Sequence, residues 1–115
     1  MQKFDEEIFG ILEDIKNFSL LVNEKLNSFD INTESKYISD IYKKRIEKIN
    51  YLLSKKEEIS WKSFIFENKT KFFEKVDDIQ NIESDNIKNL EKITGYYGEQ
   101  IKNISKQKSL LIYMK

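Results

Sequence analysis

The sequence contains no cysteine and no histidine among its 115 residues. Without cysteine the chain forms no disulfide and offers no thiol nucleophile, and without histidine it lacks the commonest general base and a common zinc ligand. It also has no nucleophile motif, no glycine-rich phosphate loop and no metal-ligand spacing. Adjacent acidic residues such as Asp77 and Asp78 point in different directions on a helix. We therefore expect the protein not to be an enzyme and to bind no metal or other cofactor.

Excess charge of one sign and long apolar runs are missing as well. Twenty basic and twenty acidic residues give a net charge of zero, so a phosphate-binding surface is not expected. No apolar run reaches the ~18–20 residues that span a bilayer. The N-terminal residues are acidic and lack the apolar core of a signal peptide. These features predict a cytoplasmic protein with no nucleic-acid partner and no membrane insertion.

Apolar residues recur at steps of three and four along the first half of the chain, which is the spacing of one helical face. The first stripe predicts a helix over about residues 4–28, in which Gly10 costs about 1 kcal/mol relative to alanine. The second stripe predicts a helix over about residues 34–59, with either Arg45 or Ile46 at one of its core positions. The two stripes consist of Phe4, Ile8, Ile11, Ile15, Phe18 and Val22, and of Ile38, Ile41, Tyr42, Ile49, Leu52, Leu53 and Ile59.

The last third of the chain carries a third stripe, which predicts a long helix over about residues 66–112. A compact domain of this size holds such a rod only if other helices lie along it. The chain is therefore expected to form one domain, residues 1–115, with an all-α fold. This fold would be an elongated antiparallel helical bundle of three helices with a long C-terminal helix. A fourth helix would result if the last one breaks at the polar residues 83–86, or at Gly95 and Gly98.

Two apolar groups do not fit a single narrow stripe. Residues 110–114 form an apolar run near the C-terminus, which favours a contact with a partner, with the chain itself or with another subunit. An aromatic group lies in the middle of the chain, and its members face several directions on a helix. It would be either core or an exposed partner surface. The aromatic group consists of Trp61, Phe64, Phe66, Phe72 and Phe73.

The C-terminal stripe also carries a recognisable pattern. It reads Ile79-x-x-Ile82-x-x-x-Asn86-x-x-x-Leu90 and, after about ten residues, Gln100-Ile101-x-x-Ile104-x-x-x-Lys108-x-x-Leu111-x-Tyr113. In this pattern the last forty residues resemble the C-terminal half of bacterial flagellar export chaperones of the FlgN/FliT type. A second helix with Arg45, Ile46 and Ile49 is similar to the middle of the same family.

This resemblance implies a small cytoplasmic chaperone that binds a flagellar subunit of the hook–filament junction or cap type and prevents its premature assembly. The client, a secreted protein subunit, would be captured through its terminal helices by an apolar helical surface. The residues expected to contact it are Tyr97, Ile101, Ile104, Leu111 and Tyr113. The alternative for these residues is that they pack onto the first two helices.

A different class of function stays open beside the chaperone. The chain would then be a self-assembling structural coiled-coil or bundle protein without a client. A chaperone would be a monomer or a small homodimer that forms a defined complex with a client fragment. A structural protein would oligomerise alone.

Overall fold

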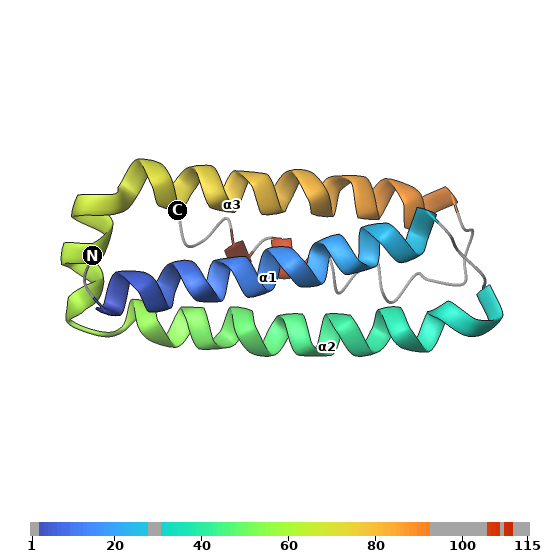
Figure 1. The fold of residues 1–115 in the computed structure, drawn as a ribbon, viewed down its shortest axis with the longest axis horizontal. Coiled ribbons are helices and arrows are strands. Elements are labelled where there is room, and N and C mark those ends of the chain that lie inside the picture. The colour runs from blue at the N-terminus through green and yellow to red at the C-terminus, as the bar shows by residue number, and fades with distance from the viewer. Residues whose placement is uncertain (1–2, 28–30, 93–105, 109, 112–115) are drawn as a thin grey trace.

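The structure, a computed structural model, describes residues 3–27, 31–92, 106–108 and 110–111 of the chain (Figure 1). Most of these residues lie in three helices, α1 (Lys3–Asn27), α2 (Ile31–Lys56) and α3 (Ser60–Lys92). No strand occurs in these ranges, and the helices pack into an elongated bundle with extents of 46 × 20 × 19 Å. The expected all-α bundle is confirmed.

The helix boundaries differ from the predicted ones mainly at the third helix. It begins at Ser60 instead of near residue 66, and the turn that precedes it occupies residues 57–59. At Asn68 the backbone leaves helical geometry, with φ −125° and ψ 15°, so that α3 is kinked there. The Asn68 side chain donates hydrogen bonds to Phe64 O at 3.0 Å and to Asp5 Oδ2 at 3.3 Å. These bonds hold the kink against α1. Whether the predicted helix continues beyond Lys92 through Gly95 and Gly98 lies outside the described residues.

α1 and α2 run antiparallel to each other (Figure 1). Tyr51 OH donates a 2.6 Å hydrogen bond to Glu7, and Arg45 Nε donates a 2.9 Å bond to Ser19. The later residue of α2 thus meets the earlier residue of α1, as antiparallel packing requires. The Lys55 ammonium, 2.7 Å from Glu7, and the Tyr51 hydroxyl lower the pKa of Glu7 below its ordinary value of 4.5. Ion pairs near the surface, such as this partly exposed one, add little stability, so the core must fix how the helices align.

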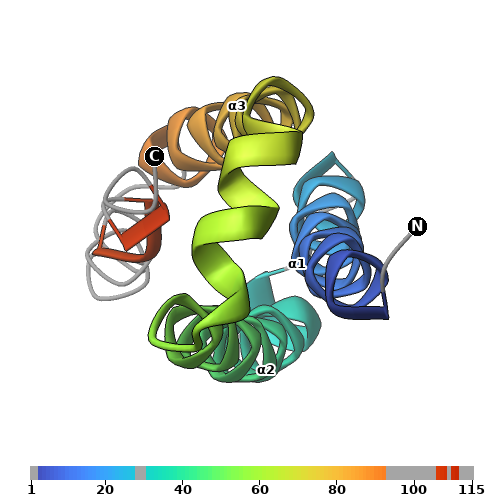
Figure 2. The same ribbon diagram turned by 90° about the vertical axis from the view of Figure 1, so that its left-hand side faces the viewer.

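The kink divides α3 into two parts. Residues 60–68, which we call the cap segment, cross the end of the bundle from α2 towards the far side (Figure 2). Residues 69–92 then run parallel to α1. The contact between Asp5 and Asn68 lies near the start of both stretches, and Asn23 Nδ2 donates a 3.0 Å hydrogen bond to Asn86 near their ends.

The apolar core consists of two clusters. The stripe residues of α1 and α2 supply much of both, as the spacing predicted. The prediction was wrong for Ile59, which is 96% exposed because α2 ends at Lys56 and Ile59 lies in the following turn. The first cluster lies at the cap-segment end and contains Ile8, Ile11, Leu12, Ile15, Ile49, Leu52, Trp61, Phe64, Phe72, Val76, Ile79 and Leu111. The second cluster lies towards the other end and contains Val22, Leu26, Ile38, Ile41, Tyr42 and Leu90.

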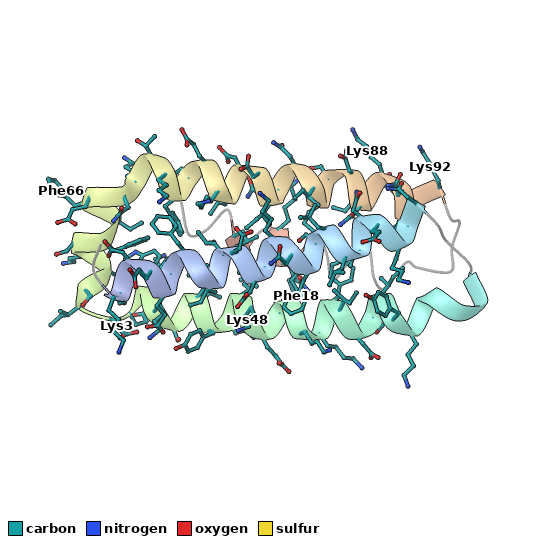
Figure 3. The ribbon with its side chains drawn as sticks, in the orientation of Figure 1. Lys3, Phe18, Lys48, Phe66, Lys88 and Lys92 are labelled. Atoms are coloured by element: carbon teal, nitrogen blue, oxygen red, sulfur yellow. The ribbon has the colours of Figure 1, made fainter. Side chains whose placement is uncertain are left out.

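The aromatic group of the sequence is mainly core. Trp61, Phe64 and Phe72 are buried, and their rings meet near right angles or tilted at centroid distances of 5.3–5.7 Å. Phe73 is partly buried against them. Phe66, by contrast, is 89% exposed and points away from the bundle at its end (Figure 3). The cap segment thus buries one of its faces and leaves the other in water.

Gly10 provides a test of the helical register. It lies in the interior of α1 on the exposed face, and no atom would lie within 4 Å of an added Cβ. Alanine at this position should therefore raise the free energy of unfolding by about 0.5–1 kcal/mol, because glycine is the more flexible residue in the unfolded chain. Urea unfolding followed by circular dichroism measures this change. A destabilised Gly10→Ala variant would show that the glycine faces a neighbour.

Candidate partner-binding site

A layer of buried polar side chains separates the two apolar clusters. Along α1 it lies between Ile15 of the first cluster and Val22 of the second. Its members come from all three helices and from the C-terminal residues, and each is at most 3% exposed. This polar layer consists of Ser19, Tyr42, Arg45, Glu83, Asn86 and Gln107.

An ion pair between Arg45 and Glu83 forms the centre of the polar layer. Arg45 Nε lies 3.4 Å from Glu83 Oε1, and both side chains are fully buried. The other carboxylate oxygen accepts a 3.2 Å hydrogen bond from Tyr42 OH. Burying two charges is costly, and the cost is offset only when both partners stay in place with their hydrogen bonds made. The pair therefore requires α2 and α3 to keep one relative register.

Burial also sets the ionisation of these groups. It lowers the pKa of the Arg45 guanidinium below its ordinary value, although the negative charge of Glu83 opposes the change. Because an arginine starts from so high a pKa, Arg45 stays charged near neutral pH. Burial, assisted by the charge of Glu83, raises the pKa of Tyr42 well above its ordinary 10. Tyr42 is thus a neutral hydrogen-bond donor to Glu83.

Asn86 and Ser19 connect the layer to α1. Asn86 Nδ2 donates to the backbone carbonyl of Ser19 at 3.1 Å, and the Ser19 hydroxyl accepts the bond from Arg45 while donating to Ile15 O at 3.2 Å. Each of the three helices therefore contributes to the polar layer, which holds them together at one level of the bundle.

The C-terminal residues complete the layer from outside the three helices. Gln107 Oε1 accepts a hydrogen bond from Arg45 Nη1, and Gln107 Nε2 donates to Tyr42 O at 3.3 Å. Lys108 Nζ donates a 2.8 Å bond to Ser84 of α3. Residues 106–108 and 110–111, which we call the C-terminal segment, are thus joined to α2 on one side and to α3 on the other.

The C-terminal segment occupies the fourth corner of the bundle. Viewed along the bundle, it lies diagonally opposite α1, between α2 and α3 (Figure 2). The backbone of α1 lies close to both other helices, whereas the backbones of α2 and α3 lie further apart and these two helices meet through long side chains such as Arg45 and Glu83. Gln107 lies at the level of Arg45, and Leu111 reaches the first cluster, which also holds Ile49. The segment therefore runs in the direction of α2. We call its place the fourth position.

The chain matches no protein-family model, no curated protein and no solved structure. Its function therefore has to be inferred from the polar layer and the fourth position. No helix in the described ranges is long and apolar enough to cross a bilayer. In the same ranges, no group of three carboxylates is placed so that it could hold a metal ion.

The structure describes one of the five residues expected to contact a client. Leu111 is fully buried in the first cluster, so its side chain reaches a partner only if the C-terminal segment moves. Tyr97, Ile101, Ile104 and Tyr113 lie outside the described residues.

Sequence reasoning missed the polar layer as a site. Arg45 was one of two alternatives for a core position of α2, and the structure places it at 0% exposure, with Ile46 only partly buried. The signal that could have found the layer is a polar residue on the apolar stripe of each helix. Arg45 also retains an unused donor, because its Nη2 is buried and finds no hydrogen-bond partner among the described residues.

Proposed function

We propose that this protein is a cytoplasmic export chaperone that binds a helix of its client in the fourth position of the bundle. The client would be a flagellar subunit of the hook–filament junction or cap type, kept from premature assembly while its terminal helix is bound. The observation that carries the proposal is the C-terminal segment, which lies between α2 and α3 and buries Gln107 and Leu111 there. A place that accepts one short helical stretch has the shape and chemistry for another.

The C-terminal segment shows what a bound helix must supply. A large aliphatic side chain has to reach the first cluster, as Leu111 does. One turn earlier, a polar side chain has to meet the polar layer, as Gln107 does through Arg45 and Tyr42. An amphipathic helix presents such residues on one face at a spacing of four. A client helix longer than the C-terminal segment would bury more apolar surface and so bind in preference to it.

Arg45 gives this position its selectivity. Its Nη1 donates a hydrogen bond to Gln107, whereas its Nη2 has no partner in the part of the chain that the structure describes. A carboxylate on the client helix would accept from both nitrogens in the forked geometry that arginine favours. A helix that placed an apolar residue at this level would leave the guanidinium short of acceptors in a buried site, which is unfavourable. The polar layer thus favours one register of the bound helix.

Titration calorimetry with synthetic terminal helices of a filament-cap protein and of a hook–filament junction protein tests the proposal. The wild-type chain should bind one of them, and Leu111→Asp should bind it about tenfold more tightly. In the wild type the C-terminal segment itself occupies the fourth position and so lowers the apparent affinity for the peptide, and the substitution weakens this competition. Leu20→Asp, the same change at a residue 44% exposed on α1, is the control and should leave the affinity unchanged.

The sign of the Leu111→Asp effect separates two modes of binding. If the substitution abolishes binding while circular dichroism shows an intact bundle, the C-terminal residues themselves hold the client, as the sequence predicts. If neither peptide binds to the wild type or to the variant, the chaperone proposal fails. Light scattering tests the alternative of a self-assembling protein, which would oligomerise without a client. Because the stripes of α1 and α2 are buried within one chain, the geometry favours the chaperone.

A further inference from the structure

The cap segment and the turn before it carry the most exposed large apolar side chains of the described residues. Ile59 is 96% and Phe66 is 89% exposed, whereas the next, Tyr51, is 46% exposed. Phe66 lies within the cap segment and Ile59 lies in the turn directly before it, so both are at the same end of the bundle. The opposite side of the segment is occupied by Trp61 and Phe64, which belong to the first cluster. Neither exposed residue therefore serves the core.

A pocket of about 250 Å³ opens beside Ile59, between the cap segment and the start of α1. Phe4, Ile59 and Phe64 form its apolar wall, and Asp5 and Glu67 line it with carboxylates. Lysine and arginine are absent from its lining. The pocket thus combines apolar surface with negative charge, next to an exposed apolar face.

The two carboxylates have room for a cation. Asp5 is only 7% exposed, and one of its oxygens accepts the bond from Asn68 Nδ2 described above. Among the described residues, no lysine or arginine forms an ion pair with Asp5 or Glu67. Among the described residues Asp5 is therefore a buried carboxylate without a cation, which is unusual because buried charges are generally paired. Glu67 lies on the exposed side of the cap segment, where it can approach the same ligand.

We propose that the outer face of the cap segment binds an amphipathic segment of a partner protein that inserts an arginine or lysine side chain into this pocket. The aliphatic stem of the inserted residue packs against Phe4 and Phe64, and its charged end pairs with Asp5 and Glu67. Apolar residues of the partner on either side cover Ile59 and Phe66. This site lies at the end of the bundle, away from the fourth position, and does not rest on the proposed function.

The sign of the charge selects this partner among the possible ones. An anionic membrane surface would be repelled by the two carboxylates that line the pocket. A basic amphipathic helix, in contrast, presents apolar residues to Ile59 and Phe66 and a cation to the carboxylates that line the pocket. A second copy of the chain is the remaining alternative, and the test below includes it.

The test uses the full-length chain and a synthetic helical peptide with one arginine between two leucines, each a turn away. A matched peptide carries citrulline, which keeps the shape of arginine but not its charge. Titrated into the labelled protein, the arginine peptide should shift NMR signals around Phe66 with a dissociation constant below about 1 mM, the range of a weak contact. The citrulline peptide should bind at least about tenfold more weakly, since a charge-assisted hydrogen bond is lost.

Substitutions then assign the binding to this face. Glu67→Gln and Phe66→Ser should each weaken binding of the arginine peptide about tenfold, and high salt should weaken binding to wild type. Glu91→Gln, the same change at an exposed residue at the other end of α3, should leave it unchanged. Because Glu67 and Phe66 are both exposed, these variants keep the fold, which circular dichroism checks.

Three results would overturn the proposal. Equal binding of the arginine and citrulline peptides would show that the positive charge of the inserted side chain does not contribute to binding. Binding to vesicles that contain anionic lipid, lost in Phe66→Ser, would assign the face to a membrane. Concentration-dependent dimerisation in sedimentation velocity, also lost in Phe66→Ser, would assign it to a second copy of the chain.

Discussion

Arg45→Met is expected to lower the free energy of unfolding by about 3–5 kcal/mol, the usual cost of removing one partner from a buried ion pair. The substitution keeps the length of the side chain but leaves the fully buried Glu83 carboxylate without its counter-charge. It also removes the donor to Gln107 and the donor to Ser19. Urea unfolding at neutral pH, followed by circular dichroism, measures the loss.

The double variant Arg45→Met/Glu83→Met is the control for this prediction. Replacing both charges by apolar side chains of similar length removes the desolvation cost together with the attraction. We expect the double variant to regain at least half of the stability lost in Arg45→Met. It should not regain all of it, since the buried Tyr42 hydroxyl loses its acceptor. A double variant as unstable as the single one would mean that the ion pair is not what the single substitution disrupts.

Phe72→Ala is expected to cost about 3–5 kcal/mol, which is typical of a phenylalanine removed from a well-packed core. Phe72 is 0% exposed, and its ring meets Trp61 and Phe64 at centroid distances of 5.5 and 5.7 Å. The cavity left by alanine would open in the first cluster where the cap segment joins the bundle. Thermal and urea unfolding both report this loss.

Phe66→Ala provides the matched comparison for Phe72→Ala. The two phenylalanines are close in sequence and belong to the same helix, but Phe66 is 89% exposed. Removing it should change the free energy of unfolding by no more than about 0.5 kcal/mol, as for other surface substitutions. Similar losses in the two variants would show that the cap segment does not divide its aromatic residues between core and surface.

Much of the fold could be predicted from residue spacing alone. Ile8, Ile15 and Val22 of the first stripe and Ile38 and Ile49 of the second are all fully buried, as predicted. This worked because an amphipathic helix repeats its pattern locally, within a few turns of chain. The bundle class followed from the length of these stripes, since each needs a neighbour along its whole length.

The polar layer could not be predicted because its pairing is not local. Residues 83–86 crossed the apolar stripe of the third helix, and the sequence therefore suggested a weak point there. In the structure α3 continues through them, and Glu83 and Asn86 face polar partners on α2 and α1. The polar interruption in the apolar stripe of α3 is matched by Arg45, which interrupts the stripe of α2. Only the arrangement of the helices brings the two together.

The start of the third helix was misplaced for a related reason. Ser60 and Asn68 are both residues that favour the ends of helices, and the sequence does not contain a proline or glycine between them to mark the turn. The chain turns just before Ser60 and kinks at Asn68, because the Asn68 side chain finds Asp5 of α1 within hydrogen-bond distance. Asp5 and Asn68 are 63 residues apart in the sequence, so no local sequence pattern predicts their contact.

Trp61 is the only tryptophan of the chain, and its position makes it a natural optical probe. Its indole is 8% exposed, beside Phe64 and Phe72, so its emission should be blue-shifted in the native protein and should report only on the capped end. The far-ultraviolet ellipticity reports on every helix at once. If the melting curves from the two signals superimpose, the two ends of the rod unfold together. The hydrophilic belt across the middle would then couple the unfolding of one end to that of the other.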